Sequence, residues 1–163
     1  MTEEQLFVQQ LNQHQNIVHK VCRLYVDTPD DREDLFQEIT LQAWKAYQNF
    51  RGDAKFSTWL YRVALNTAIT YFKKDQKQAI FTNTDQLPDV TEYNNPIEEQ
   101  VKAMYTAIGS LNKIDKALVM LYLEDYSYIE IGDMLGITAN NVAVKMNRIK
   151  LKLKEKTNKI YHQ

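Results

Sequence analysis

The chain has 163 residues, of which 44% are hydrophobic and 25% are charged, and it carries only 4 glycines and 3 prolines. This composition is typical of a globular, helix-rich protein with one medium domain or two small ones. The longest apolar run, 117–123, is too short to span a membrane, and the N-terminus lacks the basic and apolar parts of a signal peptide, so we expect a cytoplasmic protein without direct membrane insertion.

Charge is unevenly distributed along the chain, although the formal net charge is only −1. Residues 51–74 contain five basic side chains and one acidic one, and residues 145–163 contain seven basic and one acidic. The segments 1–50 and 75–100 are predominantly acidic. Two basic blocks on an acidic background indicate two contacts with a polyanion, although either block alone could be a solvated helix face.

The first part of the chain is predicted to form three helices, at residues 3–26, 29–50 and 57–74. Thr28 is expected to cap the second helix, with Pro29 at its first position, where the backbone N–H has no helical partner in any case. Ser57 is expected to cap the third helix, after the loop RGDAKF. These helices make up a predicted domain at residues 1–76.

A polar segment rich in Asn, Thr and Asp, residues 77–95, predicts a linker to a second helical domain at 96–163. Two helices are predicted at 96–109 and 113–124, followed by a short one that begins at the capping-box pattern of Ser127 and Glu130. Gly136 suits a left-handed turn after the short helix. Thr138 is expected to cap the last helix, which runs to about residue 160.

A short helix, a glycine-containing turn and a basic final helix form the pattern of a DNA-binding helix-turn-helix. One stripe of the last helix is expected to pack on the preceding helices: Val142, Met146, Ile149 and Leu153. Another face is expected to contact DNA and carries Asn141, Val144, Lys145, Arg148 and Lys152. Asparagine suits adenine edges, Lys and Arg suit phosphates and guanine edges, and valine could meet a thymine methyl group. An ordinary amphipathic helix with a wet basic face is the alternative.

The predicted helix 29–50 has apolar side chains on two faces. Its core stripe is expected to consist of Phe36, Ile39, Ala43, Tyr47 and Phe50. Leu41 and Trp44 lie nearly opposite that stripe among polar residues, which is typical of a protein-docking patch. The alternative is that another helix of the same domain covers them.

The segment 50–74 interleaves aromatic and basic side chains. This pattern suits a single-stranded nucleic acid, because aromatic rings stack on unpaired bases while Arg and Lys follow the backbone. The alternative is ordinary core packing on an amphipathic helix, and we favour it for Trp59 and Phe72. The predicted fold of the whole chain is all-α: two small helical domains joined by a polar linker, the second with a helix-turn-helix.

Two stretches of the sequence resemble a known family. The stretch DREDLFQEITLQAWKAYQNFRGDAKFSTWLYRVALNTAITYFKK is similar to region 2 of a bacterial extracytoplasmic-function (ECF) sigma factor. The stretch LNKIDKALVMLYLEDYSYIEIGDMLGITANNVAVKMNRIKLKLKEK is similar to region 4 of the same family. The resemblance implies an RNA polymerase sigma factor that directs the core enzyme to specific promoters, with residues 1–76 as region 2 and residues 96–163 as region 4.

The resemblance also implies roles for residues at matching positions. Region 2 would dock on core polymerase through Asp34, Gln37, Glu38, Leu41 and Trp44. It would capture unpaired bases of the minus-ten promoter element through Phe50, Arg51, Arg62 and Asn66. Region 4 would bind the minus-35 element through the DNA-contacting face of the last helix. The implied partners are core RNA polymerase, promoter DNA and an anti-sigma factor, and no cofactor, metal or catalytic residue is expected.

The last helix departs from the family in one place. Family members often have G-T-V-K-S-R where this chain has N-N-V-A-V-K, starting at Asn140. Two polar or basic side chains are thereby replaced by Ala143 and Val144. The base preference of the family therefore cannot be transferred to this chain.

Two other functions compete with the sigma-factor interpretation. A free-standing transcriptional regulator would use the C-terminal helix-turn-helix alone, but residues 1–74 show neither a phosphoacceptor receiver nor a ligand pocket. An enzyme is disfavoured because the three histidines, His14, His19 and His162, have no metal-binding spacing and four scattered glycines cannot form a phosphate loop. Cys22 is the only cysteine, which excludes an internal disulfide, and we interpret it as a small apolar residue on a helix.

Overall fold

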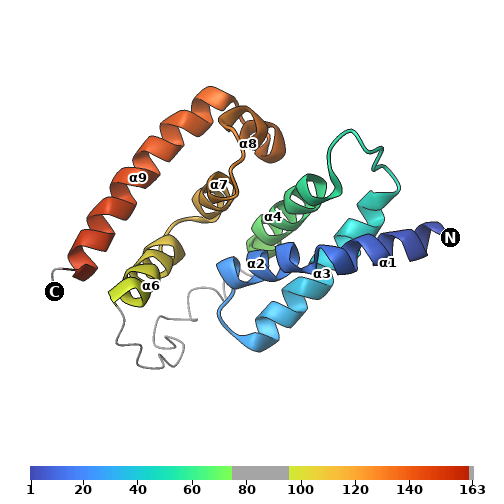
Figure 1. The fold of residues 1–163 in the computed structure, drawn as a ribbon, viewed down its shortest axis with the longest axis horizontal. Helices are drawn as coiled ribbons and strands as arrows, with labels where there is room; N and C mark the ends of the chain where they lie inside the picture. Colours follow the sequence, from blue (N-terminus) through green and yellow to red (C-terminus); the bar gives the residue numbers. More distant parts are fainter. Residues whose placement is uncertain (75–95, 162–163) are drawn as a thin grey trace. The chain divides into compact units, whose positions relative to one another are not determined.

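The computed structural model of the protein describes residues 1–74 and 96–161 (Figure 1). All regular structure in these ranges is helical, which confirms the predicted all-α class. The chain divides into two compact units, Met1–Gln86 and Leu87–Gln163. The linker predicted at 77–95 lies outside the described residues. None of the described helices is long and apolar enough to cross a membrane.

The prediction of one helix at 3–26 is wrong, because the structure breaks it at His14 into α1 (Glu3–Gln13) and α2 (Gln15–Tyr25). In an unbroken helix the His14 N–H would donate to the Gln10 carbonyl. That carbonyl instead accepts from Nδ1 of the His14 ring at 2.9 Å, and the His14 N–H donates to Leu11. The side chain takes the acceptor that the backbone would use, and this ends α1.

The start of α3 (Pro29–Tyr47) confirms the predicted cap. The Thr28 hydroxyl accepts a hydrogen bond from the Asp31 N–H at 3.2 Å, and Pro29 stands in the first turn. The helix ends three residues earlier than predicted, because the chain turns at 48–50 with backbone bonds that span three residues rather than four. The loop that follows contains Gly52, whose φ of +79° lies in the left-handed region that favours glycine.

The core stripe of α3 differs in part from the predicted one. The buried residues are Leu35, Ile39, Ala43 and Tyr47. Phe36 and Phe50 are half-buried, and the Phe36 ring stacks on His19 with centroids 4.8 Å apart. The stripe is therefore rotated toward Leu35, which the sequence pattern did not single out.

The helix α4 (Phe56–Lys74) begins one residue before the predicted cap, so Ser57 lies within its first turn. The Trp59 N–H donates to the Lys55 carbonyl at 3.0 Å, so the helical hydrogen bonds begin with the carbonyl of the residue before Phe56. Phe56 is buried, with its ring centroid 5.2 Å from that of His14. Burial of this ring fixes the first turn, which a local capping rule did not anticipate.

The helices α2, α3 and α4 pack on one another around a common core. Its fully buried members include Val18, Val21, Leu35, Ile39, Leu60 and Leu65. Cys22 is buried in the same unit, as interpreted from the sequence, and burial raises the pKa of its thiol from 9.0 to about 11. The side chain of Phe72 lies outside the described residues.

The second unit consists of α6 (Pro96–Gly109), α7 (Lys113–Leu123), α8 (Tyr128–Leu135) and α9 (Ala139–Tyr161). The capping box at the start of α8 is present: the Glu130 N–H donates to the Ser127 hydroxyl at 3.2 Å, and the Ser127 N–H donates to the Glu130 carboxylate at 3.1 Å. The Thr138 hydroxyl accepts from the Asn141 N–H at 3.1 Å and caps α9. These local predictions are confirmed.

Candidate nucleic-acid interface

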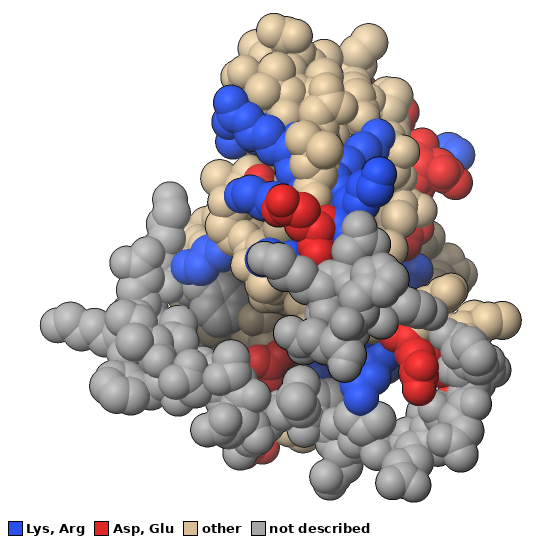
Figure 2. All heavy atoms as spheres, turned by 90° about the vertical axis from the view of Figure 1, so that its left-hand side faces the viewer, with Lys and Arg blue, Asp and Glu red and all other residues tan. Residues whose placement is uncertain are grey.

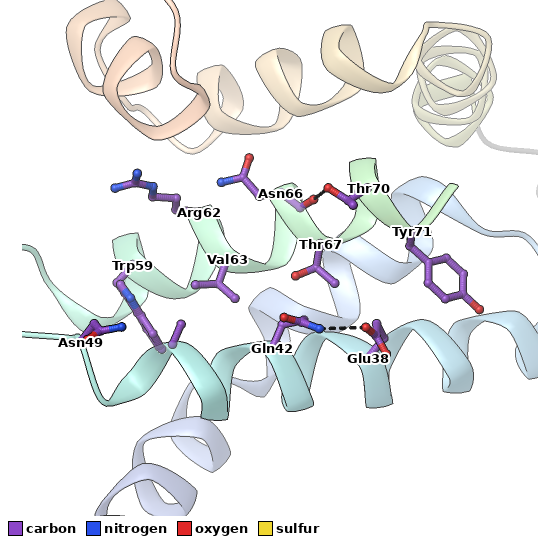
Figure 3. A pocket seen from close by; sticks show the side chains of 11 residues that line it. Glu38, Gln42, Asn49, Trp59, Arg62, Val63, Asn66, Thr67, Thr70 and Tyr71 are labelled. Carbon is purple, nitrogen blue, oxygen red and sulfur yellow. Dashed lines mark hydrogen bonds between the residues drawn. The ribbon is translucent and has the colours of Figure 1, made fainter. Parts of the chain in front are cut away.

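A groove of about 500 Å³ runs between α3 and α4 of the first unit (Figure 3). Gln42 and Glu38 line it from α3, and the Gln42 amide donates to the Glu38 carboxylate at 3.0 Å. Arg62 and Asn66, both exposed, lie one helical turn apart on its α4 side. The groove therefore offers amide, carboxylate and guanidinium groups within one surface hollow.

An aromatic cluster closes the end of the groove nearest the loop between α3 and α4. The Trp59 ring lies 5.0 Å from Phe50, 5.3 Å from Phe56 and 6.1 Å from Tyr47, measured between centroids. Trp59 is half-buried and lines the groove, so our interpretation of it as core packing is correct only in part. Its contacts with three rings hold it in place, and the exposed part of the ring suits stacking by an unpaired base.

The four residues implied for the minus-ten element do not all lie in the groove. Arg62 and Asn66 share the α4 side of the groove. Phe50 belongs to the aromatic cluster, 5.9 Å from Tyr47, whereas Arg51 is exposed on the loop.

Sequence reasoning missed the residues that line the groove from α3, among them Gln42 and Asn49. A usable signal was present, since Glu38, Gln42 and Ala46 follow one another at four-residue intervals and so share a face. This row flanks the apolar stripe and lines the groove.

The outer face of α3 carries the residues implied for polymerase docking. Asp34 and Gln37 are exposed, and Leu41 is 45% exposed. Trp44 is half-buried, because α1 covers it in part: its ring centroid lies 5.2 Å from that of Phe7. The alternative of coverage by another helix therefore holds for Trp44 and not for Leu41. Glu38 lies at the border between this outer face and the groove, since its side chain also lines the groove.

The turn between α8 and α9 depends on two glycines. Gly136 has φ +75°, the left-handed conformation expected after α8. Gly132, which the sequence analysis did not single out, lies within α8, and a Cβ there would be 2.6 Å from the Ile137 carbonyl oxygen. A side chain at Gly132 would push the turn away from α8, so this glycine permits the close approach that a helix-turn-helix requires.

The helix α9 packs on α6, α7 and α8 along the predicted stripe. Val142, Met146 and Ile149 are buried, while Leu153 is half-buried. The predicted DNA-contacting residues lie off this stripe: Asn141, Arg148 and Lys152 are exposed, Lys145 is half-buried and Val144 is 43% exposed. On the α9 side of the molecule, Figure 2 shows Lys and Arg side chains on both flanks of a band that is uncharged in its upper part and carries acidic side chains lower down.

The direction opposite the buried stripe passes through Val144 rather than through the lysines, counting 100° per residue. Asn140 and Arg148 each lie about 40° from Val144 around the helix and Asn147 lies about 60° from it, and all three are exposed. Sequence reasoning did not name Asn140 or Asn147. The position of the buried stripe is a second signal for this face, since the surface farthest from the core is free of packing within the unit.

Some of the basic side chains on α9 are engaged within the unit. The Lys150 ammonium lies 4.7 Å from the centroid of the Tyr122 ring. A hydrogen bond to Tyr122 is the main cause that raises the pKa of Lys150, and a hydrogen bond to Tyr128 is the second. Lys156 donates to the hydroxyl of Ser110. In the part of the chain that the structure describes, no group of His, Cys, Asp and Glu side chains is arranged to hold a metal ion.

Two family models match the chain in the expected order. The model described as Sigma-70 region 2 matches residues 11–78, and the model described as Sigma-70, region 4 matches residues 102–153. The ECF RNA polymerase sigma-E factor of Escherichia coli strain K12 is 30% identical over 147 residues, which cover 80% of this chain and 76% of the relative. The ECF RNA polymerase sigma factor SigM of Mycobacterium tuberculosis is 25% identical over 154 residues, covering 90% and 74%.

Solved structures show the same fold. The sigma factor RpoE from Bartonella quintana, solved in complex with the anti-sigma factor NepR, matches with a TM-score of 0.71 at 16% identity, covering 93% of this chain and 96% of that chain. CnrH, solved in complex with the cytosolic domain of CnrY, matches with a TM-score of 0.65 at 20% identity, covering 94% and 88%.

Proposed function

We propose, from the premise that this chain belongs to the extracytoplasmic-function group of RNA polymerase sigma factors, that its two units divide promoter recognition between them. A sigma factor of this group directs core polymerase to specific promoters, so the free-standing regulator is no longer a competing function. In our proposal residues 1–76 bind core polymerase and the minus-ten element, residues 77–95 link the units, and residues 96–163 bind the minus-35 element.

The outer face of α3 is proposed as the polymerase-docking face, with Asp34, Gln37, Glu38, Leu41 and Trp44. Its support is a large apolar side chain left 45% exposed, Leu41, among acidic and amide groups. Such a side chain gains from burial on a partner, while the polar groups around it give the contact its specificity. Trp44 would be held in place for that contact by the Phe7 ring of α1.

The groove between α3 and α4 is proposed as the site for an unpaired base of the minus-ten element. The Trp59 and Phe50 rings would supply stacking, and Asn66 would supply hydrogen bonds to a base edge. Arg62 and Arg51 would contact the phosphate backbone. The free protein cannot expose such a base, because unpairing a duplex costs a few kcal/mol per flipped base. The site would therefore be used only once polymerase has opened the DNA.

The helix α9 is proposed as the minus-35 recognition helix, through Asn141, Val144, Lys145, Arg148 and Lys152. Residues near the start of a recognition helix contact base edges, and later residues contact phosphates. By this rule Asn141 and Val144 would contact bases, while Lys152 would contact the backbone. The chain would contribute binding and no catalytic group, so we propose that it is not an enzyme, and that it acts in the cytoplasm where the polymerase works.

One observation carries the proposal: both sigma regions are present on one chain in the family order, and the second ends in an exposed, partly basic helix. The test is transcription by purified core polymerase on a genomic DNA library, with and without the chain. Transcripts with common upstream and downstream elements should appear only when the chain is added. Nanomolar, sequence-specific binding to duplex DNA by the chain alone at physiological salt, without any effect on core polymerase, would refute the proposal.

An anti-sigma factor is proposed as the third partner. Two proteins of the same fold were solved in complexes, one with the anti-sigma factor NepR and the other with the cytosolic domain of CnrY. The fold of this chain is therefore compatible with binding a partner of this kind. The exposed docking face of α3 is one surface that an inhibitor could cover to exclude polymerase. Co-purification of the tagged chain from its own host, with core polymerase depleted, would identify the partner by mass spectrometry, and recovery of the chain alone would contradict the proposal.

A further inference from the structure

The second half of α9 is held to its unit differently from the first half. In the first half a narrow apolar stripe is buried, formed by Val142, Met146 and Ile149. Farther along, the next residue of this stripe, Leu153, is only half-buried. A helix held along one narrow stripe can still roll about the line of that contact, because the stripe gives no support on either side. Contacts beside the stripe therefore decide how firmly the rotation of α9 is fixed.

Two lysines make such contacts, one on each side of the stripe. At about 100° per residue, Lys150 lies about 60° from Leu153 around the helix, and Lys156 lies about 60° from it in the opposite direction. Lys156 donates to the hydroxyl of Ser110, in the turn between α6 and α7. The Lys150 ammonium lies 4.7 Å from the centroid of the Tyr122 ring, in the last turn of α7. The second half of α9 is thus attached on both sides by polar contacts.

The contact of Lys150 involves two tyrosines on either side of the turn between α7 and α8. The centroids of the Tyr122 and Tyr128 rings lie 6.4 Å apart, and Lys150 hydrogen-bonds to both side chains. The Asp125 N–H donates to the Tyr122 carbonyl at 3.1 Å and closes the turn between the two tyrosines. Lys150 therefore joins α9 to the end of α7 and to the start of α8 at once.

Lys150 lies on the side of α9 away from the proposed phosphate contacts. It is about 160° around the helix from Arg148 and from Lys152, and about 140° from Lys145. Its ammonium is also engaged by the Tyr122 ring. Lys150 is therefore placed to hold the helix rather than to share the phosphate contacts of the other flank.

We propose that Lys150, held by Tyr122 and Tyr128, is a positioning residue for promoter binding, because it fixes the rotation of α9 about its own axis. This rotation sets where the side chains of the opposite flank lie relative to the DNA backbone. The inference rests on the proposed function of α9 as the minus-35 recognition helix. Without the lysine contact, α9 would also populate rolled orientations that do not bind. The apparent affinity would then fall in proportion to the fraction of chains that remain competent.

The substitution Lys150→Met tests this contact, because it removes the charge and the hydrogen-bond donors and keeps an unbranched side chain that favours a helix. Holoenzyme with this variant should bind a promoter about twofold to fivefold more weakly, the range for one exposed cation–π contact. The loss should be the same at every salt concentration, because the number of phosphate contacts is unchanged. Lys150→Arg should restore the affinity, since a guanidinium also stacks on an aromatic ring and donates hydrogen bonds.

Two further variants separate the contact from the charge. Lys154→Met is the matched control, because Lys154 is exposed one turn later on the same flank of α9. It should bind the promoter like the wild-type chain. Addition of Tyr122→Leu to Lys150→Met should cause no further loss of affinity, because the two side chains act through one contact. All variants should keep the helical circular dichroism spectrum of the wild-type chain at the assay temperature.

Any of four results would overturn the inference. Lys150→Met could bind the promoter as tightly as the wild-type chain, Lys154→Met could weaken binding equally, or Lys150→Arg could fail to restore it. Lys150→Met could also lower the slope of the salt dependence by about 0.9, which would make Lys150 a phosphate contact. In each case the wild-type chain still directs polymerase to its promoter, so the proposed function stands. Failure of the wild-type holoenzyme to bind any promoter specifically would instead refute the proposed function.

Discussion

Replacement of Leu41 by alanine should weaken polymerase binding without weakening the fold. Leu41 is 45% exposed on α3, so it contributes less to the core than a buried leucine, and alanine is the best helix former. Substitutions at such surface positions usually change stability by no more than about 0.5 kcal/mol. The melting temperature of the first unit should therefore change little.

The loss of affinity follows from the area that docking can still bury. Full burial of a leucine side chain stabilises by about 1.5–3 kcal/mol. Because somewhat less than half of Leu41 is exposed, docking can gain about 1 kcal/mol from it, which corresponds to roughly fivefold in the dissociation constant. Trp44→Ala should show both effects, since Trp44 packs on Phe7 at 5.2 Å and its removal also loosens α1 from α3.

The matched control is Leu6→Ala. Leu6 is 42% exposed, nearly the same as Leu41, but it lies on α1 rather than on the outer face of α3. The assay is titration of the fluorescently labelled chain with core polymerase, accompanied by a thermal melt of each variant. Leu41→Ala should bind about fivefold more weakly than Leu6→Ala at equal melting temperature. Equal affinities for the two variants would show that the outer face of α3 does not touch polymerase.

Three further predictions concern the turn of the second unit, the buried thiol and the basic residues of α9. Gly132→Ala should destabilise the second unit by about 1–3 kcal/mol in thermal melts, because its Cβ would lie 2.6 Å from a backbone carbonyl, whereas Gly109→Ala, with no atom within 4 Å, should melt normally. Burial raises the pKa of the Cys22 thiol to about 11, so folded protein at pH 8 should react with iodoacetamide far more slowly than protein in urea, and rapid alkylation of the folded chain would contradict its burial. The free energy of unfolding should also fall as the pH rises from 9 through 11, because the unfolded thiol loses its proton first. Lys152→Ala should reduce the salt dependence of holoenzyme binding by about one phosphate contact, and Lys150→Ala should not; equal reductions would place both lysines on DNA.

Local features of the fold could be predicted from the sequence because they depend on a few neighbouring residues. The hydroxyl caps of Thr28 and Thr138, the capping box at Ser127 and the left-handed Gly136 all satisfy or redirect backbone groups within one turn. Their chemistry is complete within four residues, so no knowledge of the tertiary fold is needed. The buried stripe of α9 was predictable for a related reason, since its period extends over three turns.

The features that were missed depend on contacts between helices. Ser57 is a good capping residue, but the helix starts earlier because Phe56 is buried against the ring of His14. The helical periodicity of α3 placed Trp44 far from the core, but it could not show that Phe7 of α1 packs on the Trp44 ring. The groove between α3 and α4 likewise exists only once two helices are side by side. Patterns along one helix give the direction of each side chain and not the identity of its neighbour.

The basic residues of α9 differ in their surroundings. Lys150 is held over the ring of Tyr122, Lys154 follows it one turn later on the same flank, and Lys156 donates to a serine of the α6–α7 turn. On the other flank lie Lys145, Arg148 and Lys152. If all six of these side chains bound phosphates, a plot of the logarithm of the binding constant against the logarithm of the salt concentration would have a slope of about −5. Three phosphate contacts would give a slope of about −3. We therefore expect the phosphate contacts of this helix to come from Lys145, Arg148 and Lys152, and we expect the bases to meet the surface that the buried stripe turns outward.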